Sequence, residues 1–133
     1  MNMNNVVGET STRGVEAEYF ATLEQGNFVI QRCSDCERAI FYPRQFCPHC
    51  DSEQVVWERA SGLGTVHSTT TVRIKPDHSY NVSVIELDEG VRMMSRVDGI
   101  SPEEVKIGMR VQARIIQQSG KPVVVFDVSS EVA

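Results

Sequence analysis

The 133-residue sequence is poor in aromatic side chains, in positive charge and in long apolar runs. No apolar run approaches the roughly 18 residues that a transmembrane helix needs, so we expect no membrane partner. The start, Met1-Asn-Met-Asn-Asn, lacks the basic-then-apolar order of a secretory signal, which predicts a cytoplasmic location. Hydrophobic residues make up 41% and charged residues 23%, which is the composition of a globular protein rather than a disordered one.

The lack of a surplus of positive charge argues against nucleic-acid binding. The chain has 13 Lys and Arg against 18 Asp and Glu, giving −5. Residues 1–60 carry −4 and residues 61–133 carry −1, so neither half attracts a phosphate backbone through counterion release. Seven of the nine aromatic residues precede residue 61, and this change in composition predicts a module boundary near Ser61.

All four cysteines lie within 18 residues, as two CxxC pairs separated by ten residues. This spacing is typical of a structural zinc site, because each pair offers two thiolates from one tight turn and zinc binds four ligands in a tetrahedron. With all four positions filled by protein, no site remains for water or substrate. The predicted ligands of one structural Zn²⁺ are Cys33, Cys36, Cys47 and Cys50.

Other uses of the cysteines remain open at this point. Disulfides need an oxidising compartment, and a redox CxxC would normally occur once, in a βαβ unit that the sequence does not show. Iron of the rubredoxin type also binds four thiolates. His49, inside the second pair, is interpreted as a surface residue or a neighbour of the ligands rather than as a ligand.

The second half of the chain predicts a five-stranded OB-fold barrel. Alternating runs at 65–74, 81–87, 91–97, 109–116 and 122–128 predict the strands. Ser101-Pro102-Glu103-Glu104 is a capping box that predicts a short helix between strands 3 and 4, which is the OB-fold order. On the first strand, alternation places on one face Val66, Ser68, Thr70, Val72 and Ile74.

The first 30 residues are less regular. Val15, Tyr19, Phe20 and Leu23 recur at helical spacing and predict an amphipathic helix, which either joins a core or docks a partner. Ser61-Gly62-Leu63-Gly64 precedes a strand, whereas phosphate loops precede a helix, so we interpret it as a hinge or bulge. The predicted architecture is mainly β: a flexible tail at 1–14, helix and strand at 15–30, a rubredoxin-like zinc ribbon at 31–60 and the OB-fold at 61–133.

No set of side chains stands out as self-contained catalytic machinery, so we expect no catalysis by this chain alone. The histidines, serines and carboxylates show no nucleophile-elbow or paired-acid pattern. Arg92 and Arg96 on one strand, with Arg110 and Arg114 on another, predict a small cationic strip that is either a solvated face or a contact for cofactor phosphates. Two aromatics and a charge of −1 make the barrel a poor single-strand binder, although a nucleic-acid-binding ribbon stays a minor alternative.

The run from Ala39 to Phe46, between the cysteine pairs, carries three aromatic residues and Arg44. Such a composition is typical of a protein–protein hot spot. The structural alternative is that the loop packs against Trp57 and the barrel. We therefore predict that the residues that contact a partner or coenzyme A are Phe41, Tyr42, Arg44, Arg92 and Arg96.

These motifs together resemble a known family. Gln31-Arg32-Cys33-x-x-Cys36, Phe41-Tyr42-Pro43-Arg44, Cys47-Pro48-x-Cys50, Trp57 and Ser61-Gly62-x-Gly64-x-Val66 resemble the acyl-CoA-associated zinc-ribbon/OB-fold proteins, long known only as a domain of unknown function. The resemblance covers about residues 15 to 128. Glu37 departs from the Gly that often follows the second cysteine of a zinc knuckle.

The resemblance implies an accessory subunit. Members of this family accompany thiolase-like enzymes and sometimes enoyl-CoA hydratases, and help to form or close an acyl-CoA site. It implies a non-catalytic subunit of a thiolase or thiolase-like retro-aldolase complex in lipid or aromatic acid degradation, with acyl-CoA as a ligand shared with the partner. A free-standing acyl-CoA or nucleotide carrier that uses the OB face is the alternative.

Overall fold

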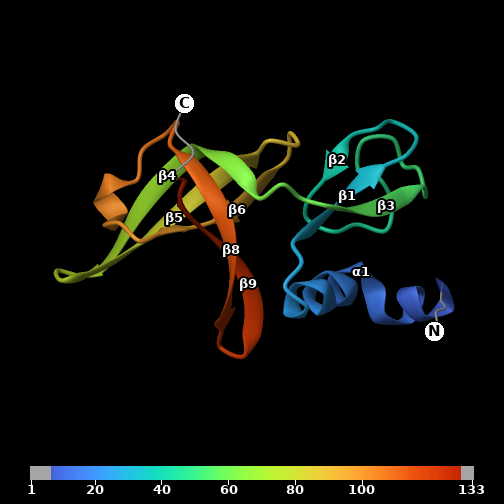
Figure 1. The fold of residues 1–133 in the computed structure, drawn as a ribbon, viewed down its shortest axis with the longest axis horizontal. Helices are drawn as coiled ribbons and strands as arrows, with labels where there is room; N and C mark the ends of the chain where they lie inside the picture. Colours follow the sequence, from blue (N-terminus) through green and yellow to red (C-terminus); the bar gives the residue numbers. More distant parts are fainter. Residues whose placement is uncertain (1–6, 130–133) are drawn as a thin grey trace.

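The computed structural model describes residues 7–129, with side chains from residue 14 onward. One helix is followed by two sheets, a three-stranded sheet in the order β2-β1-β3 and a six-stranded sheet in the order β6-β5-β4-β8-β9-β7 (Figure 1). The elements are α1 Val7–Glu24, β1 Val29–Cys33, β2 Ala39–Ile40, β3 Val55–Arg59, β4 Leu63–Lys75, β5 His78–Leu87, β6 Arg92–Ser95, β7 Val97–Asp98, the 3₁₀ turn Pro102–Glu104, β8 Arg110–Gln118 and β9 Lys121–Val128.

Helix α1 begins earlier than the sequence predicted. The predicted tail at 1–14 is wrong from Val7 onward, and residues 1–6 lie outside the described part of the chain. The segment before Gly14 has no apolar periodicity to mark it, but the internal hydrogen bonds of a helix do not require one. Gly14 (φ 84°, ψ 158°) interrupts the helix. Beyond it, Tyr19 and Leu23 are buried, as their spacing predicted.

The small sheet is built on β1, which pairs antiparallel with β2 and with β3. One face of this sheet contributes Ile30 and Ala39 to the same apolar core as Tyr19 and Leu23 of α1. That core continues into the large sheet through side chains such as Phe126, which is fully buried. Helix, ribbon sheet and OB sheet therefore share one core.

The large sheet has the predicted strand sequence, with one difference in count. The third predicted strand is divided at Arg96 into β6, which pairs antiparallel with β5, and β7, which pairs parallel with β9. The two edge strands of the sheet are thus consecutive in the chain. A single 3₁₀ turn stands where the short helix was expected, and the Ser101 N–H donates to the Glu104 carboxylate at 3.2 Å.

A β-bulge at His67 changes which residues of β4 face inward. The register pairs Val66 with Ile85 but Ser68 with Val84, so His67 is an extra residue. The prediction that Val66 shares one face with the alternate residues from Ser68 to Ile74 is therefore wrong, because a one-residue bulge reverses the alternation after Val66. The Thr69 hydroxyl instead accepts hydrogen bonds from the Asn81 Nδ2 and Ser83 Oγ atoms, at 2.7 and 3.0 Å.

The predicted boundary segment links the two sheets. Gly62 has φ 81°, and Gly64 lies on β4 opposite Leu87 of the antiparallel neighbour β5. A Cβ atom on Gly64 would lie 2.8 Å from the Glu86 carbonyl oxygen, so only glycine fits there without a backbone shift. Within residues 7–129, no helix combines the length and the apolarity needed to cross a bilayer.

Candidate metal centre and the neighbouring contact surface

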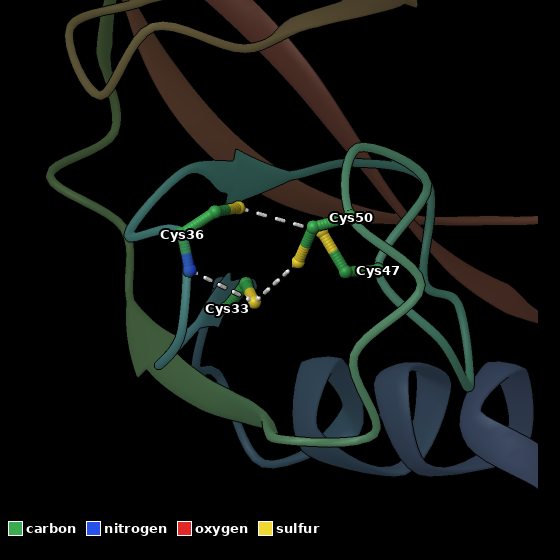
Figure 2. Close-up of side chains that lie close together, drawn as sticks. All are labelled: Cys33, Cys36, Cys47 and Cys50. Atoms are coloured by element: carbon green, nitrogen blue, oxygen red, sulfur yellow. Dashed lines mark hydrogen bonds between the residues drawn. The ribbon is translucent and has the colours of Figure 1, made fainter.

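The two cysteine pairs form matching turns. In the first, the Glu37 N–H donates to the Cys33 carbonyl at 2.8 Å, and in the second the Asp51 N–H donates to the Cys47 carbonyl at 2.8 Å. Each turn also directs a backbone N–H at its first sulfur, from Cys36 to Cys33 Sγ (3.4 Å) and from His49 to Cys47 Sγ (3.3 Å). Figure 2 shows the four cysteine side chains converging from the two turns.

The sulfur positions fit a tetrahedral metal ion. The four Sγ atoms all lie within 4.8 Å of one another. Across the two turns, Cys33 Sγ is 3.6 Å from Cys50 Sγ, and Cys36 Sγ is 3.6 Å from Cys47 Sγ. Zinc with Zn–S bonds of about 2.3 Å separates the sulfurs of a regular tetrahedron by about 3.8 Å. The donor set is therefore consistent with a structural Zn²⁺.

The residue after each pair has a left-handed backbone without being glycine. Glu37 has φ 67° and Asp51 has φ 65°. The departure at Glu37 therefore leaves the turn geometry intact, and the carbonyl of Glu37 accepts a hydrogen bond from the Arg32 guanidinium at 2.8 Å. The two turns are joined by Ser52, whose hydroxyl donates to the Asp35 carboxylate at 2.5 Å. These contacts hold both turns around the sulfurs.

The cysteine thiols differ in acidity. Backbone N–H donors, that of Cys36 first, lower the pKa of Cys33 to about 6, which favours the thiolate that metals bind. For Cys50, the N–H of Ser52 is outweighed by desolvation and by the neighbouring thiols, which raise its pKa to about 12. Cys33 and Cys47 are buried. His49 Nδ1 lies 3.3 Å from an Arg38 guanidinium nitrogen and is exposed, as expected for a residue that is not a ligand.

The aromatic loop packs in a way that neither sequence interpretation foresaw. Phe41 and Tyr42 contact Tyr19 of α1, with ring centroids 5.6 and 6.0 Å apart. The Tyr42 hydroxyl donates to Glu16 of the same helix at 2.6 Å, and burial together with this carboxylate raises the pKa of Tyr42 to about 12. Trp57, against which the structural alternative placed this loop, donates its indole N–H to Glu18 of α1 at 3.2 Å.

Gln31 positions Arg44, and sequence reasoning missed it. Gln31 is 3% exposed, and its side-chain amide both donates to the Arg44 carbonyl (2.9 Å) and accepts from the Arg44 N–H (2.7 Å). The loop backbone is therefore fixed to β1, while the Arg44 side chain is exposed. A polar residue at a position where strand alternation requires burial is the signal that would have found Gln31.

The four arginines of the predicted cationic strip are neutralised one by one. Arg92 pairs with Glu86 (3.3 Å), Arg96 with Asp98 (2.8 Å), Arg110 with Asp88 (2.8 Å) and Arg114 with Asp127 (2.7 Å). The carboxylates come from neighbouring strands and from the β5–β6 turn, so the strand alternation that placed the arginines on one face did not reveal them. The surface is a mixed ionic one rather than a free cationic strip.

Four of the five predicted contact residues border two adjacent cavities. An apolar cavity of about 460 Å³ lies between α1, the aromatic loop and strands β6 and β9, and Phe41, Tyr42 and Arg92 line it. A more polar cleft of about 390 Å³ lies between the ribbon and the β5–β6 turn, and Phe41, Arg44 and Arg92 line it. Arg96 lines neither of them.

Comparison with known proteins decides the family. Residues 20–56 match the ChsH2 rubredoxin-like zinc ribbon domain, and residues 57–115 match the ChsH2 C-terminal OB-fold domain. A DUF35 domain-containing scaffold protein of Methanocaldococcus jannaschii is 34% identical over 97 residues, covering 67% of this chain and 69% of the relative. The chain belongs to the ChsH2/DUF35 family.

Other relatives extend this picture. The chain of known structure described as "Ltp2-ChsH2(DUF35) aldolase" is 31% identical, with a TM-score of 0.75 over 85% of this chain and 93% of that one. A DUF35-family protein of Sulfolobus solfataricus shares the fold with a TM-score of 0.65 at 20% identity, over 92% of this chain and 94% of that one. A probable enoyl-CoA hydratase alpha subunit of Thermomonospora curvata is 35% identical over 71% of this chain, which spans 31% of that relative's length.

Proposed function

We propose that this ChsH2/DUF35 chain is a non-catalytic subunit of an acyl-CoA-processing complex whose catalytic subunit is a thiolase or a thiolase-like retro-aldolase. It would help to form or close the acyl-CoA site, in cytoplasmic degradation of lipids or aromatic acids. The likeness to a chain of an Ltp2-ChsH2 aldolase supports the aldolase partner. The relative named as a hydratase alpha subunit supports an enoyl-CoA hydratase as a further partner.

The main support for this proposal is that four of the predicted contact residues lie around two adjacent cavities. Phe41, Tyr42, Arg44 and Arg92 come from two modules and border cavities beside a four-cysteine centre whose ligand positions are all filled by protein. Bound zinc would supply structural order here and no Lewis-acid chemistry, because a complete tetrahedron has no place for substrate. The surface is therefore equipped to bind rather than to react, and the reacting groups belong to the partner.

Purification of the tagged chain from its own cells tests the proposal. We expect a thiolase-like protein to co-elute in stoichiometric amount, identified by mass spectrometry, and its acyl-CoA activity to fall when this chain is removed. A bare, zinc-loaded monomer from cells that actively use the pathway would refute the subunit role. The control is the same tag on an unrelated zinc-ribbon protein.

A free-standing acyl-CoA carrier is the second candidate, because both cavities lie within this one chain. It predicts a chain that elutes alone and binds coenzyme A tightly without a partner. Elution in a complex, with weak binding by the isolated chain, favours the subunit instead.

A further inference from the structure

The four sulfurs of the cysteine centre differ in their access to solvent. Cys33 and Cys47 are fully buried, Cys36 is half-buried and Cys50 is exposed. The residues on either side of Cys50 are exposed as well, so the second turn presents its last cysteine to solvent. A small reagent that approaches the centre from solvent therefore meets Cys50 first.

Exposure is the property that separates the four cysteines once metal is bound. Zinc binding requires every ligand sulfur to be a thiolate, whatever its acidity without the metal. The thiolate is the form of cysteine that attacks peroxides, and its susceptibility to oxidation rises with exposure. Cys50 combines the thiolate form with the greatest exposure of the four.

A second cysteine lies where it can complete an oxidation that begins at Cys50. The Sγ atom of Cys33 lies 3.6 Å from that of Cys50, across the two turns (Figure 2). Cys36 and Cys47 make a second contact of 3.6 Å between the turns. An accessible cysteine beside a second one that can resolve its oxidised form is typical of a redox sensor. The arrangement favours a disulfide between the turns.

The reaction with hydrogen peroxide balances with no further oxidant. The Cys50 thiolate attacks one peroxide oxygen, the O–O bond breaks and hydroxide leaves, which gives a sulfenic acid. The Cys33 thiolate then attacks the Cys50 sulfur, the S–O bond breaks and the S–S bond forms, with loss of a second hydroxide. Two electrons thus pass from two thiolates to one peroxide, and two protons from solvent convert the hydroxides into water.

The disulfide would remove half of the metal's donor set. Cys36 and Cys47 alone do not complete a tetrahedron, so the affinity for zinc falls and the metal leaves. The two turns stay joined, because the Ser34 N–H donates to the Gln54 carbonyl at 2.8 Å and the new S–S bond links them covalently. Loss of the metal would therefore leave the turns folded, in a form that a thiol reductant can reverse.

We propose that the cysteine centre is a peroxide-sensitive switch, in which Cys50 is oxidised first, Cys33 forms a disulfide with it and zinc is released. The turn that carries Cys50 also carries Pro48 and His49, which line the cleft beside Arg44, so the switch would change that surface. The switch goes beyond the proposed function and does not depend on it, because it uses residues of this chain alone.

Disulfide mapping of the zinc-loaded full chain tests the assignment. Trypsin cleaves after Arg38 and Arg44, which lie between the two cysteine pairs, so a bridge between the turns joins two peptides and a bridge within one turn does not. After a limiting dose of hydrogen peroxide and alkylation of the remaining thiols, we expect joined peptides whose fragments assign Cys33 and Cys50. Dimedone, which traps sulfenic acids, should label Cys50. Zinc release to a chromogenic chelator should accompany the bridge.

Two matched variants separate Cys50 from the other ligands. Histidine also binds zinc in tetrahedral sites, so Cys50→His and Cys36→His should each retain one zinc per chain. Under peroxide, Cys50→His should release zinc at least about tenfold more slowly than the wild type, because the exposed thiolate is gone. Cys36→His keeps both Cys50 and Cys33, so its release rate should stay within about twofold of the wild-type rate.

Reversal is the last measurement. Dithiothreitol and zinc should restore one zinc per chain and the original amide NMR spectrum, and failure to recover either would show damage in place of a switch. A bridge within one turn, a sulfenic acid on another cysteine, or equal release rates for Cys50→His and the wild type overturns the proposal. If neither histidine variant binds zinc, the wild-type map decides. Co-elution with a partner judges the proposed function separately.

Discussion

The cysteine turns and the OB-fold sheet lie in one short chain but are held together differently. Around the turns, the apolar cluster among the described residues consists of Cys33, Ile40 and Cys47, two of which are predicted metal ligands. The other cluster has sixteen buried residues and includes Val66, Ile85 and Phe126 of the OB sheet. Metal coordination therefore substitutes for apolar burial at the turns, whereas the OB sheet is stabilised by the apolar core that it shares with α1 and the ribbon sheet.

The largest effect should come from removing a metal ligand. Cys33→Ser should abolish zinc binding and unfold the turns, because the metal contributes roughly 10–16 kcal/mol of folding free energy to sites of this kind. Metal content by mass spectrometry and amide NMR signals report the two losses, and the signals of β4 and β5 should persist. His49→Ala, next to the ligands, should keep one zinc per chain. A Cys33→Ser protein whose turns stay folded without metal would contradict the view that metal coordination stabilises them.

The OB sheet should depend on packing instead. Phe126 is fully buried, so Phe126→Ala should lower the free energy of unfolding by about 3–5 kcal/mol. Denaturant unfolding, followed by the β8 and β9 amide signals, measures the loss. A chelator should not enlarge this loss if the two regions are stabilised independently; a loss that grows with metal removal would show that they are not.

A smaller effect is expected where the two modules meet. Gly64→Ala places a Cβ atom 2.8 Å from the Glu86 carbonyl, and the resulting shift of β4 against β5 should cost about 1–3 kcal/mol. The measurement is the urea midpoint. Gly120→Ala is the comparison variant, because an added Cβ there meets nothing within 4 Å. Its loss of stability measures only the cost of placing alanine in a left-handed backbone conformation. A greater loss at Gly120 would argue against the close approach at Gly64.

The smallest effect concerns acid stability. Hydrogen bonding to Arg114 lowers the pKa of Asp127 below its ordinary value. This pair therefore contributes stability above the unfolded-state pKa of about 3.9, and the contribution disappears as the pH falls through the lower folded-state value. Asp127→Asn should lower the unfolding midpoint of β8 and β9 slightly at pH 7 and not at pH 2. An equal difference at both pH values would exclude the ion pair as its cause.

Residue spacing was sufficient for the metal centre but not for its surroundings. Two CxxC pairs predict four converging sulfurs because each pair lies within one turn, where local backbone geometry decides the result. The contacts of Arg44 and Tyr42 depend on Gln31 and Glu16, which lie 13 and 26 residues away. Such long-range partners leave no periodic signal in the chain.

The same limit explains the errors on the OB side. Alternation predicted most strands within a few residues, but the bulge at His67 reversed the inward face beyond Val66, because register is set by the partner strand. The sequence by itself determined the module order, the convergence of the four cysteines, the packed helix at Tyr19 and Leu23, and the family. Only the tertiary structure decided that the arginines are paired and that the aromatic loop packs on α1 beside two cavities, because those facts depend on side chains from distant segments meeting in space.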